Sequence, residues 1–369
     1  MKKVSYLLVV LTTVLLFLGG LGIEKNLIEL QGVIFAVLLV FAARIIKGKL
    51  SFPKTFSLYM VFLILAFAST FWSQDIEGSF EYLMLFVTGG LFWLSFYNLK
   101  DELRKVFPWS LLVLGFIFIL SYLAYILKGS NWRVPYSLVT PYTDNHHHLG
   151  DFWALVAVFL FYENLKKRRW ELIITLIIAL AVLAFSLSRS AYVALAVGVF
   201  YIFLKKGKFK KFKKPIVFVL VLAYGLFLFA SVFKTTVYSR VYFLQGILGF
   251  IKNPLGVGLG NFLLISKDLI TNPWGGDFFS LFAHNIFLEV LVGMGVLGLS
   301  FVVWFLIVAR SLWRSKKEEG LLYQALFFVL AANFFFDITY CIPTMFWLWY
   351  LVLGLGQNDI ILRKVAAKS

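Results

Sequence analysis

Apolar residues follow one another in runs of about 20 along most of the chain, and short polar breaks separate these runs. One such run crosses the hydrocarbon layer of a bilayer as a helix, because about 30 Å must be covered at about 1.5 Å per residue. The runs predict about twelve transmembrane helices, near residues 4–23, 27–46, 55–72, 79–98, 107–127, 147–164, 170–187, 189–204, 215–234, 281–308, 320–339 and 343–361. We therefore expect an all-α, polytopic transmembrane helix bundle, in which residues 1–369 form a single integral membrane domain.

Basic residues are concentrated in every second connection between these helices. Those connections, together with the two terminal segments, hold 27 of the 35 Lys and Arg residues. Because cytoplasmic loops of membrane proteins are enriched in Lys and Arg, both termini are expected in the cytoplasm. Residues 128–146 and 235–280 are then outside, and 235–280 is the one larger periplasmic loop. The run at 4–23 lacks a small-x-small cleavage site, so we expect it to remain as an uncleaved first span.

The segment 170–205 is too long to be one transmembrane helix. As a single helix its 36 residues would measure about 54 Å, nearly twice the thickness of the membrane core. Basic residues flank it on both sides, so both of its ends are expected in the cytoplasm and the chain must cross twice. We expect the turn at residues 186–190, where serine hydroxyls can bond to the backbone of the turn and Arg189 lies at the outer mouth of the bundle.

The composition excludes a soluble globular protein. Hydrophobic residues make up 61% of the chain, and the mean hydropathy is +0.89. The net charge of +17 would suggest nucleic-acid binding in a soluble protein, but here the basic residues lie in short loops that determine topology. We therefore expect the lipid bilayer as a partner, and no nucleic acid.

Three side chains on the expected outer face are candidates for chemistry: Arg189 in the tight turn, Arg240 in the large loop and His284 before the helix at 281–308. An arginine costs about 2.5–3.5 kcal/mol to insert at mid-membrane, so its presence favours a function. The alternative for Arg189 is an interfacial arginine that reaches the headgroups. A helix N-terminus and nearby arginines disfavour imidazolium, so His284 is expected to be neutral and able to accept a proton. Its alternative role is a helix cap or a packing residue.

A glycine-rich segment, residues 253–261, lies between these candidates. Its alternating glycines suit a tight loop with an exposed backbone, whose amides could bind phosphate. The spacing is not that of a dinucleotide-binding fingerprint, and no strand–helix–strand unit surrounds it. The other interpretation is simple turn formation.

Several further polar residues have no clear role in the sequence. His146, His147 and His148 begin an expected helix, but adjacent helical histidines point in different directions, so we expect no metal ion there and contact of His147 with acceptor or phosphate. Glu289 lies four residues after Asn285 on one helix face and could bond to it or to a charged partner. For Asp151 and Asp337, structural ion pairs or helix–helix hydrogen bonds are as plausible as substrate contact.

Two guanidinium groups and a neutral imidazole on one membrane face suit a particular reaction. Arginine can bind a diphosphate bidentately, and the imidazole remains free to take a proton. Transfer of a sugar from a polyprenyl diphosphate to an acceptor hydroxyl needs a base for that hydroxyl and cations for the departing diphosphate.

At these residues the sequence resembles the O-antigen ligase and polymerase family of membrane glycan transferases. The resemblance rests on residues 186–191, on residues 253–258, and on His284 and Asn285 followed by Gly293, Gly295 and Gly298, and it covers about residues 146–355. It implies a bundle similar to the GT-C class, and metal-independent inverting transfer from undecaprenyl diphosphate at the periplasmic face of the inner membrane, without a cofactor. It also implies that Arg189, Arg240 and His284 are catalytic. We expect the remaining substrate contacts from Ser188, Ser190, Asn253, Gly256, Gly258, Asn285 and His147.

The sequence leaves three alternatives to an O-antigen ligase that glycosylates lipid A-core or another envelope glycan. A polymerase of the same family would extend a glycan acceptor. A peptidoglycan-type polymerase would need an essential carboxylate in the large loop, where Asp268 and Asp277 are available. A lipid-linked glycan flippase or transporter would use the same cations without making bonds, but it should show inverted repeats, and we find none.

Overall fold

The computed structural model describes residues 25–127, 146–207, 237–266, 268–269, 280–315 and 317–357, and these residues form helices and no strands. The α-helices are α2 (Lys25–Lys47), α3 (Phe56–Ser69), α4 (Ile76–Asn98), α5 (Lys100–Leu103), α6 (Phe107–Leu127), α7 (His146–Lys167), α8 (Trp170–Ser186), α9 (Arg189–Lys205), α11 (Val237–Lys252), α12 (Phe262–Ser266), α13 (Ile286–Met294), α14 (Leu299–Arg314), α15 (Leu321–Phe336) and α16 (Pro343–Gly356). Four 3-10 helices connect them: η1 (Thr70–Trp72), η2 (Gly295–Gly298), η3 (Glu318–Gly320) and η4 (Thr339–Cys341).

Several of these helices can cross a membrane. Four are long and apolar enough by length and composition, at Glu29–Lys47, Ile76–Asn98, Ile286–Arg314 and Glu318–Phe336. Four more are apolar but shorter, at Phe56–Trp72, Phe107–Leu120, Trp170–Ser186 and Pro343–Gly356. The expected all-α membrane protein is thus confirmed. The number of about twelve spans stays a prediction, and the spans expected at 4–23 and 215–234 lie outside the described residues.

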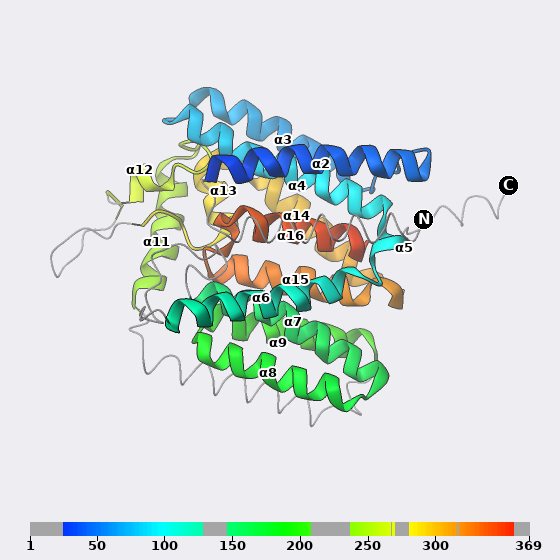
Figure 1. Cartoon of the computed structure of the whole chain (residues 1–369). Coiled ribbons are helices and arrows are strands. Elements are labelled where there is room, and N and C mark those ends of the chain that lie inside the picture. Colours follow the sequence, from blue (N-terminus) through cyan, green and yellow to red (C-terminus); the bar gives the residue numbers. More distant parts are fainter. Residues whose placement is uncertain are drawn as a thin grey trace.

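The long helices lie side by side, whereas α11 runs across one end of the bundle, next to α12 and α13 (Figure 1). The expected large loop is therefore partly helical. Its helix α11 approaches α13 closely, because a Cβ atom at Gly246 would lie 3.0 Å from the Leu288 side chain and one at Gly249 would lie 3.2 Å from that of Val292. These two glycines let α11 pack closely against α13, and this contact places α11 next to the start of the helical segment at 286–314.

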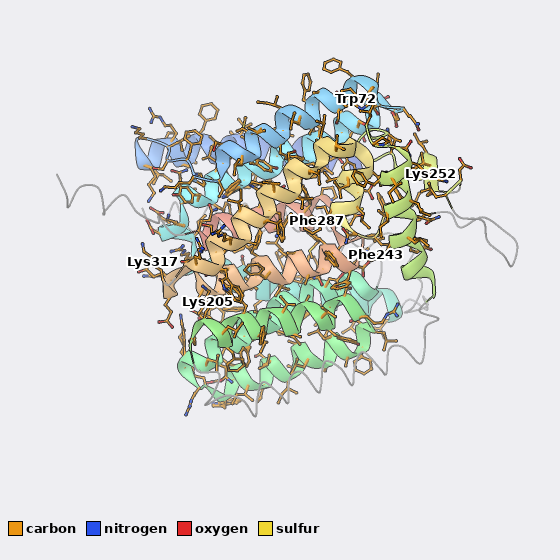
Figure 2. All side chains as sticks on the ribbon, turned by 180° about the vertical axis from the view of Figure 1, so that it is seen from behind. Trp72, Lys205, Phe243, Lys252, Phe287 and Lys317 are labelled. Atoms are coloured by element: carbon orange, nitrogen blue, oxygen red, sulfur yellow. The ribbon has the colours of Figure 1, made fainter. Side chains whose placement is uncertain are left out.

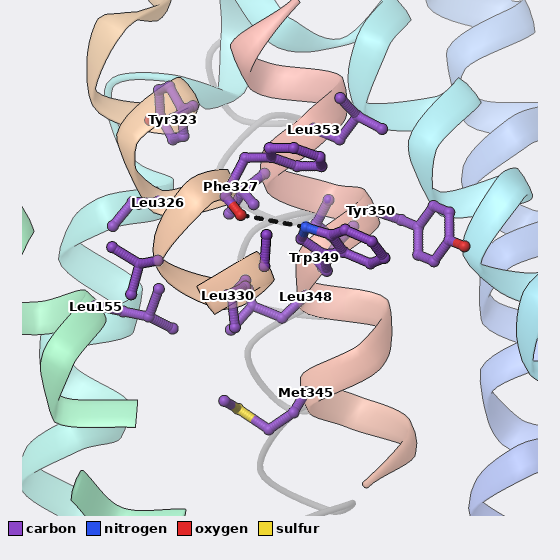
Figure 3. Close-up of a cluster of buried hydrophobic side chains, with 14 of the residues drawn as sticks. Leu155, Tyr323, Leu326, Phe327, Leu330, Met345, Leu348, Trp349, Tyr350 and Leu353 are labelled. Carbon is purple, nitrogen blue, oxygen red and sulfur yellow. Dashed lines mark hydrogen bonds between the residues drawn. The ribbon is translucent and has the colours of Figure 1, made fainter. Parts of the chain in front are cut away.

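Helix α16 is the centre of the packing, since every one of its residues is buried. Its large side chains interlock with those of α15, and the Trp349 Nε1 atom donates a hydrogen bond of 3.2 Å to the Phe327 carbonyl (Figure 3). Helix α2 instead exposes apolar residues such as Leu38 and Phe41 on its outer side. Because α16 is apolar all round and has neighbours on every side, it is an inner helix, while α2 is suited to contact lipid.

Labelled residues identify the two ends of the bundle. Lys205 and Lys317 lie at one end, and Trp72 and Lys252 lie at the other (Figure 2). At the first end, ion pairs connect helix ends that are far apart in the sequence, such as Lys206 after α9 with Glu318 of η3 at 3.5 Å. Helix α11 and the start of α13 belong to the second end (Figure 1).

The glycine-rich segment packs its backbone directly against the junction of α13 and η2. The N–H of Val257 donates to the Val292 carbonyl at 3.1 Å, that of Gly258 to the Gly293 carbonyl at 2.8 Å, and that of Val296 to the Pro254 carbonyl at 2.9 Å. No side chain fits between the two backbones, because a Cβ atom at Gly295 would lie 2.1 Å from the Pro254 carbonyl oxygen. The glycines of both segments therefore serve one contact, which fixes residues 254–258 to the helix that follows His284.

Replacement of Gly295 by alanine should strongly destabilise the protein. Gly295 combines φ 60° and ψ −140°, a conformation that side chains disfavour, with the close contact to Pro254. We expect a loss of about 3 kcal/mol or more. Gly207→Ala is a matched control, since Gly207 has φ 61° but no atom within 4 Å, and should cost about 1–2 kcal/mol. Thermal unfolding of the purified proteins in detergent measures both, and equal melting temperatures would contradict the backbone contact.

Candidate functional site

The chain breaks between α8 and α9 as the sequence predicts. Helix α8 ends at Ser186, Leu187 adopts a left-handed conformation with φ 50°, and Ser188 caps α9 by accepting a hydrogen bond of 3.3 Å from the Ala191 N–H. The Ser186 hydroxyl accepts from the Ser188 N–H at 3.3 Å. The serines thus satisfy backbone groups of the turn, which confirms the predicted turn, and Arg189 is the first residue of α9.

Arg189 is half-buried at this turn. Within the described part of the chain its guanidinium makes no hydrogen bond or ion pair. A half-buried arginine at the mouth of an apolar bundle is suited to bind an anionic ligand.

Two carboxylates meet beside this turn. Asp151 of α7 is fully buried, and its Oδ1 atom accepts hydrogen bonds of 3.0 Å from the hydroxyls of both Ser188 and Ser190. The Ser190 hydroxyl also lies 2.9 Å from the Asp337 Oδ2 atom, and the Thr339 hydroxyl donates to Asp151 Oδ2. Of the roles that the sequence left open for Asp151, the described residues show helix–helix hydrogen bonding.

The end of α15 joins this turn to the segment that contains His284. Asp337 directly follows α15, and its Oδ1 atom accepts a hydrogen bond of 2.7 Å from the Ile338 N–H. Two residues earlier, the Phe335 carbonyl accepts a hydrogen bond of 3.0 Å from the Asn285 side-chain amide. The N-terminal ends of α9 and α13 therefore meet at the C-terminal end of α15.

His284 lies at this junction, in the turn before α13. It has a left-handed backbone with φ 53°, and Asn285 caps α13 by accepting hydrogen bonds from the N–H groups of Phe287 and Leu288. The imidazole stacks on the Tyr242 ring of α11, with centroids 4.3 Å apart and an interplanar angle of 9°. The turn and the stacked ring together hold the imidazole in a fixed orientation.

Burial lowers the pKa of His284, and the carboxylate of Asp337 acts in the opposite direction. The direction agrees with the neutral imidazole that the sequence predicts. The cause differs, since desolvation is the larger effect, whereas the sequence argument relied on the helix N-terminus and on arginines.

Arg240 belongs to α11, two residues before Tyr242, so the backbone of α11 brings it to the same end of the bundle as His284. Its side chain lies outside the described residues, as does that of His147 near the start of α7. His148, the next residue, is buried. Within the described ranges, no group of three His, Cys, Asp or Glu residues could hold a metal ion.

The other expected substrate-binding residues use their polar groups inside the protein. The Asn253 side chain donates to the Gly249 carbonyl, both ends of the Asn285 amide are engaged, and the Gly256 N–H donates to the Asn253 carbonyl. Gly258, Ser188 and Ser190 are bonded as described above. Their observed contacts shape the site, and direct contact with substrate stays a prediction.

Two residues of this arrangement were not assigned to the site from the sequence. Asp337 was named but given no role, and Tyr242 was not named, because nothing in its local sequence indicates that its ring meets His284. The only sequence signal for Tyr242 is its position two residues after Arg240 in an apolar stretch.

Replacement of Asp151 by alanine should destabilise the junction of α7, α9 and η4. The buried hydroxyls of Ser188, Ser190 and Thr339 would each lose a hydrogen bond to Asp151, which should cost about 3 kcal/mol in total. Asp151→Asn keeps an oxygen acceptor and should cost clearly less. Melting temperatures in detergent compare the two variants, and an Asp151→Ala protein as stable as the wild type would contradict a stabilising network.

Comparison with known proteins agrees with the resemblance found in the sequence. Residues 174–303 match the family described as O-antigen ligase, and this segment contains Arg189, Arg240 and His284. No curated protein and no solved structure matches the chain. Residues 174–303 are therefore similar to the O-antigen ligase family, whose members are glycan transferases that act on lipid-linked glycans.

Proposed function

We propose that this protein is an O-antigen ligase-like glycosyltransferase, which moves a glycan from undecaprenyl diphosphate to a hydroxyl of lipid A-core or of another envelope glycan. The observation that carries the proposal is the continuous set of contacts between three distant segments. Ser190, beside Arg189, bonds at 2.9 Å to Asp337, which directly follows α15. Asn285, beside His284, bonds to the Phe335 carbonyl at the end of α15, and His284 stacks on Tyr242 of α11, the helix that contains Arg240.

In the proposed reaction, His284 takes the proton of the acceptor hydroxyl as the hydroxyl oxygen attacks the anomeric carbon. The bond from that carbon to the diphosphate breaks, and its electron pair leaves with undecaprenyl diphosphate. A single displacement from the opposite face inverts the configuration of the anomeric carbon. Neutral His284 is able to act as the base, and Asp337 stabilises the imidazolium that forms.

The arginines act on the leaving group. Negative charge develops on the diphosphate as the glycosidic bond breaks, and guanidinium groups stabilise that charge where their contacts strengthen in the transition state. Arg189 and Arg240 supply the positive charge that a metal ion can provide in other glycosyltransferases, so we propose a metal-independent reaction. The glycine-rich segment and residues Ser188, Ser190, Asn285 and His147 would complete the substrate pocket.

We further propose that the site faces the periplasm and that both termini are cytoplasmic. The end of the bundle with α11 is opposite the end with Lys205 and Lys317 (Figure 2). Since basic loops remain in the cytoplasm, this separation supports a periplasmic site in the inner membrane.

A polymerase of the same family is the main alternative, because the same parts would transfer the glycan to a second lipid-linked glycan. A peptidoglycan-type polymerase has less support, since Asp268 is exposed and Asp277 lies outside the described residues. A flippase would bind the donor without consuming it.

Purified protein in detergent should be given undecaprenyl diphosphate glycan with lipid A-core, or with donor alone. Transfer to lipid A-core supports the ligase, and longer glycans from donor alone support the polymerase. If wild-type protein bound the donor but never cleaved it with either acceptor, the transferase proposal would be wrong.

His284→Ala and Arg189→Ala should each lower glycan transfer by about 100-fold or more, because one removes the base and the other a cation of the leaving-group site. Arg189→Lys should lie between Arg189→Ala and wild type, since lysine keeps the charge but not the bidentate geometry. Arg310→Ala is a control at an exposed arginine of α14 and should transfer normally. Near-normal transfer by the first two variants, at normal protein levels, would contradict the assignment.

The pH dependence of kcat/KM should reflect His284. The base works only when neutral, and burial lowers its pKa from the ordinary value of 6.5, so activity should persist below pH 6.5 and fall at lower pH. Asp337→Asn should shift this fall to still lower pH, because the carboxylate that favours imidazolium is removed. A midpoint above pH 6.5, or a shift to higher pH in the variant, would argue against His284 as the base.

A further inference from the structure

Glu289 is a buried carboxylate in α13 that the proposed reaction does not use. Its side chain is 1% exposed, and its Oε2 atom accepts hydrogen bonds of 2.8 Å from the Ala283 N–H and 3.1 Å from the Tyr340 hydroxyl. The sequence suggested Asn285 or a charged residue as its partner. Among the described residues, its hydrogen bonds go instead to a backbone amide and a tyrosine.

The bond to Ala283 spans the turn that contains His284. Asn285 fixes the downstream side of this turn as the cap of α13, and Glu289 fixes the upstream side, so His284 lies between two anchored residues. His284 has φ 53°, a conformation that residues other than glycine seldom adopt. If the upstream side were released, the backbone at His284 could return to an ordinary conformation and move the imidazole away from Tyr242.

The bond to Tyr340 links the same turn to the segment after α15. Tyr340 belongs to η4, three residues after Asp337. Glu289 therefore holds the backbone before His284 and the segment that contains Asp337 with one carboxylate oxygen.

We propose that Glu289 is a positioning residue that holds His284 in its left-handed conformation, stacked on Tyr242. The proposal rests on the proposed function of His284 as the base. Its physical basis is that Glu289 accepts a hydrogen bond from the N–H of Ala283, a fully buried residue, and that a buried N–H without an acceptor is costly.

Three substitutions of Glu289 separate the effects of hydrogen-bond acceptance, charge and side-chain length. Glu289→Gln keeps an oxygen at the same distance without charge, Glu289→Asp keeps the charge but is one methylene shorter, and Glu289→Ala has neither. We expect Glu289→Gln to retain kcat within about 3-fold. Glu289→Asp and Glu289→Ala should lower kcat by about 10-fold or more with KM for the donor nearly unchanged, because the base is misplaced while the donor still binds.

The control is Glu163→Ala, which removes another poorly exposed carboxylate, paired with Lys167 near the far end of α7, and should leave transfer unchanged. An active Glu289→Asp with an inactive Glu289→Gln would show that the charge matters, and would overturn the proposal. Normal activity of Glu289→Ala would overturn it as well.

A second measurement does not depend on transfer. The chain has four histidines, so selective isotope labelling gives four imidazole signals, and His284→Gln identifies the one that belongs to His284. Stacking on Tyr242 should shift that signal by the ring current, and Tyr242→Leu gives the unstacked reference. The shift should remain in Glu289→Gln and disappear in Glu289→Asp and Glu289→Ala. A shift that persists in all three variants would overturn the proposal, whereas an inactive wild type with this pattern would contradict only the proposed function.

Discussion

The hydrogen bonds of the Ser190 hydroxyl to carboxylates of two other segments determine how the site is assembled. Asp151 of α7 and Asp337 at the end of α15 both lie within 3.0 Å of it. A buried carboxylate in an apolar bundle is costly unless hydrogen-bond donors surround it, so α9 must keep its first turn at this point. The start of α9 also favours nearby negative charge, because a helix dipole is positive at its N-terminus. The position of Arg189 follows from this constraint, since Arg189 lies between two serines that are both bonded to Asp151.

The rest of the site depends on the same junction through α15. The Asn285 amide bonds to the Phe335 carbonyl, and Glu289 bonds to Tyr340, so the entry of α13 is attached both before and after Asp337. Helix α11 is fixed by the close approach of its glycines to α13 and by the stacking of Tyr242 on His284. Polar contacts at this end of the bundle thus orient the imidazole, while apolar packing around α16 stabilises the helices that carry these contacts.

Much of this architecture could be predicted from the sequence, because the length of apolar runs and the placement of Lys and Arg are strong local signals. The break at residues 186–190 followed from the length of segment 170–205, and the serines proved to bond to the turn as expected. Helix α11 was expected only as part of a loop, because its 16 residues are too short and too polar at the start to read as a span. The glycine-rich segment allowed two interpretations, and the amides of Val257 and Gly258 are used for packing on α13.

Fewer of the residues that form the site could be predicted from the sequence. Arg189 and His284 could be recognised from their local motifs, but Tyr242 and Glu289 act through contacts that no spacing reveals.

The central claim is that Arg189, Arg240 and His284 share one diphosphate at the end of the bundle opposite Lys205 and Lys317. An electron cryomicroscopy map of the protein in lipid nanodiscs with undecaprenyl diphosphate glycan tests it most directly. We predict a diphosphate in contact with both guanidinium groups, with His284 facing the anomeric carbon. A diphosphate bound at the opposite end, or guanidinium groups too far apart to reach one diphosphate, would contradict the account.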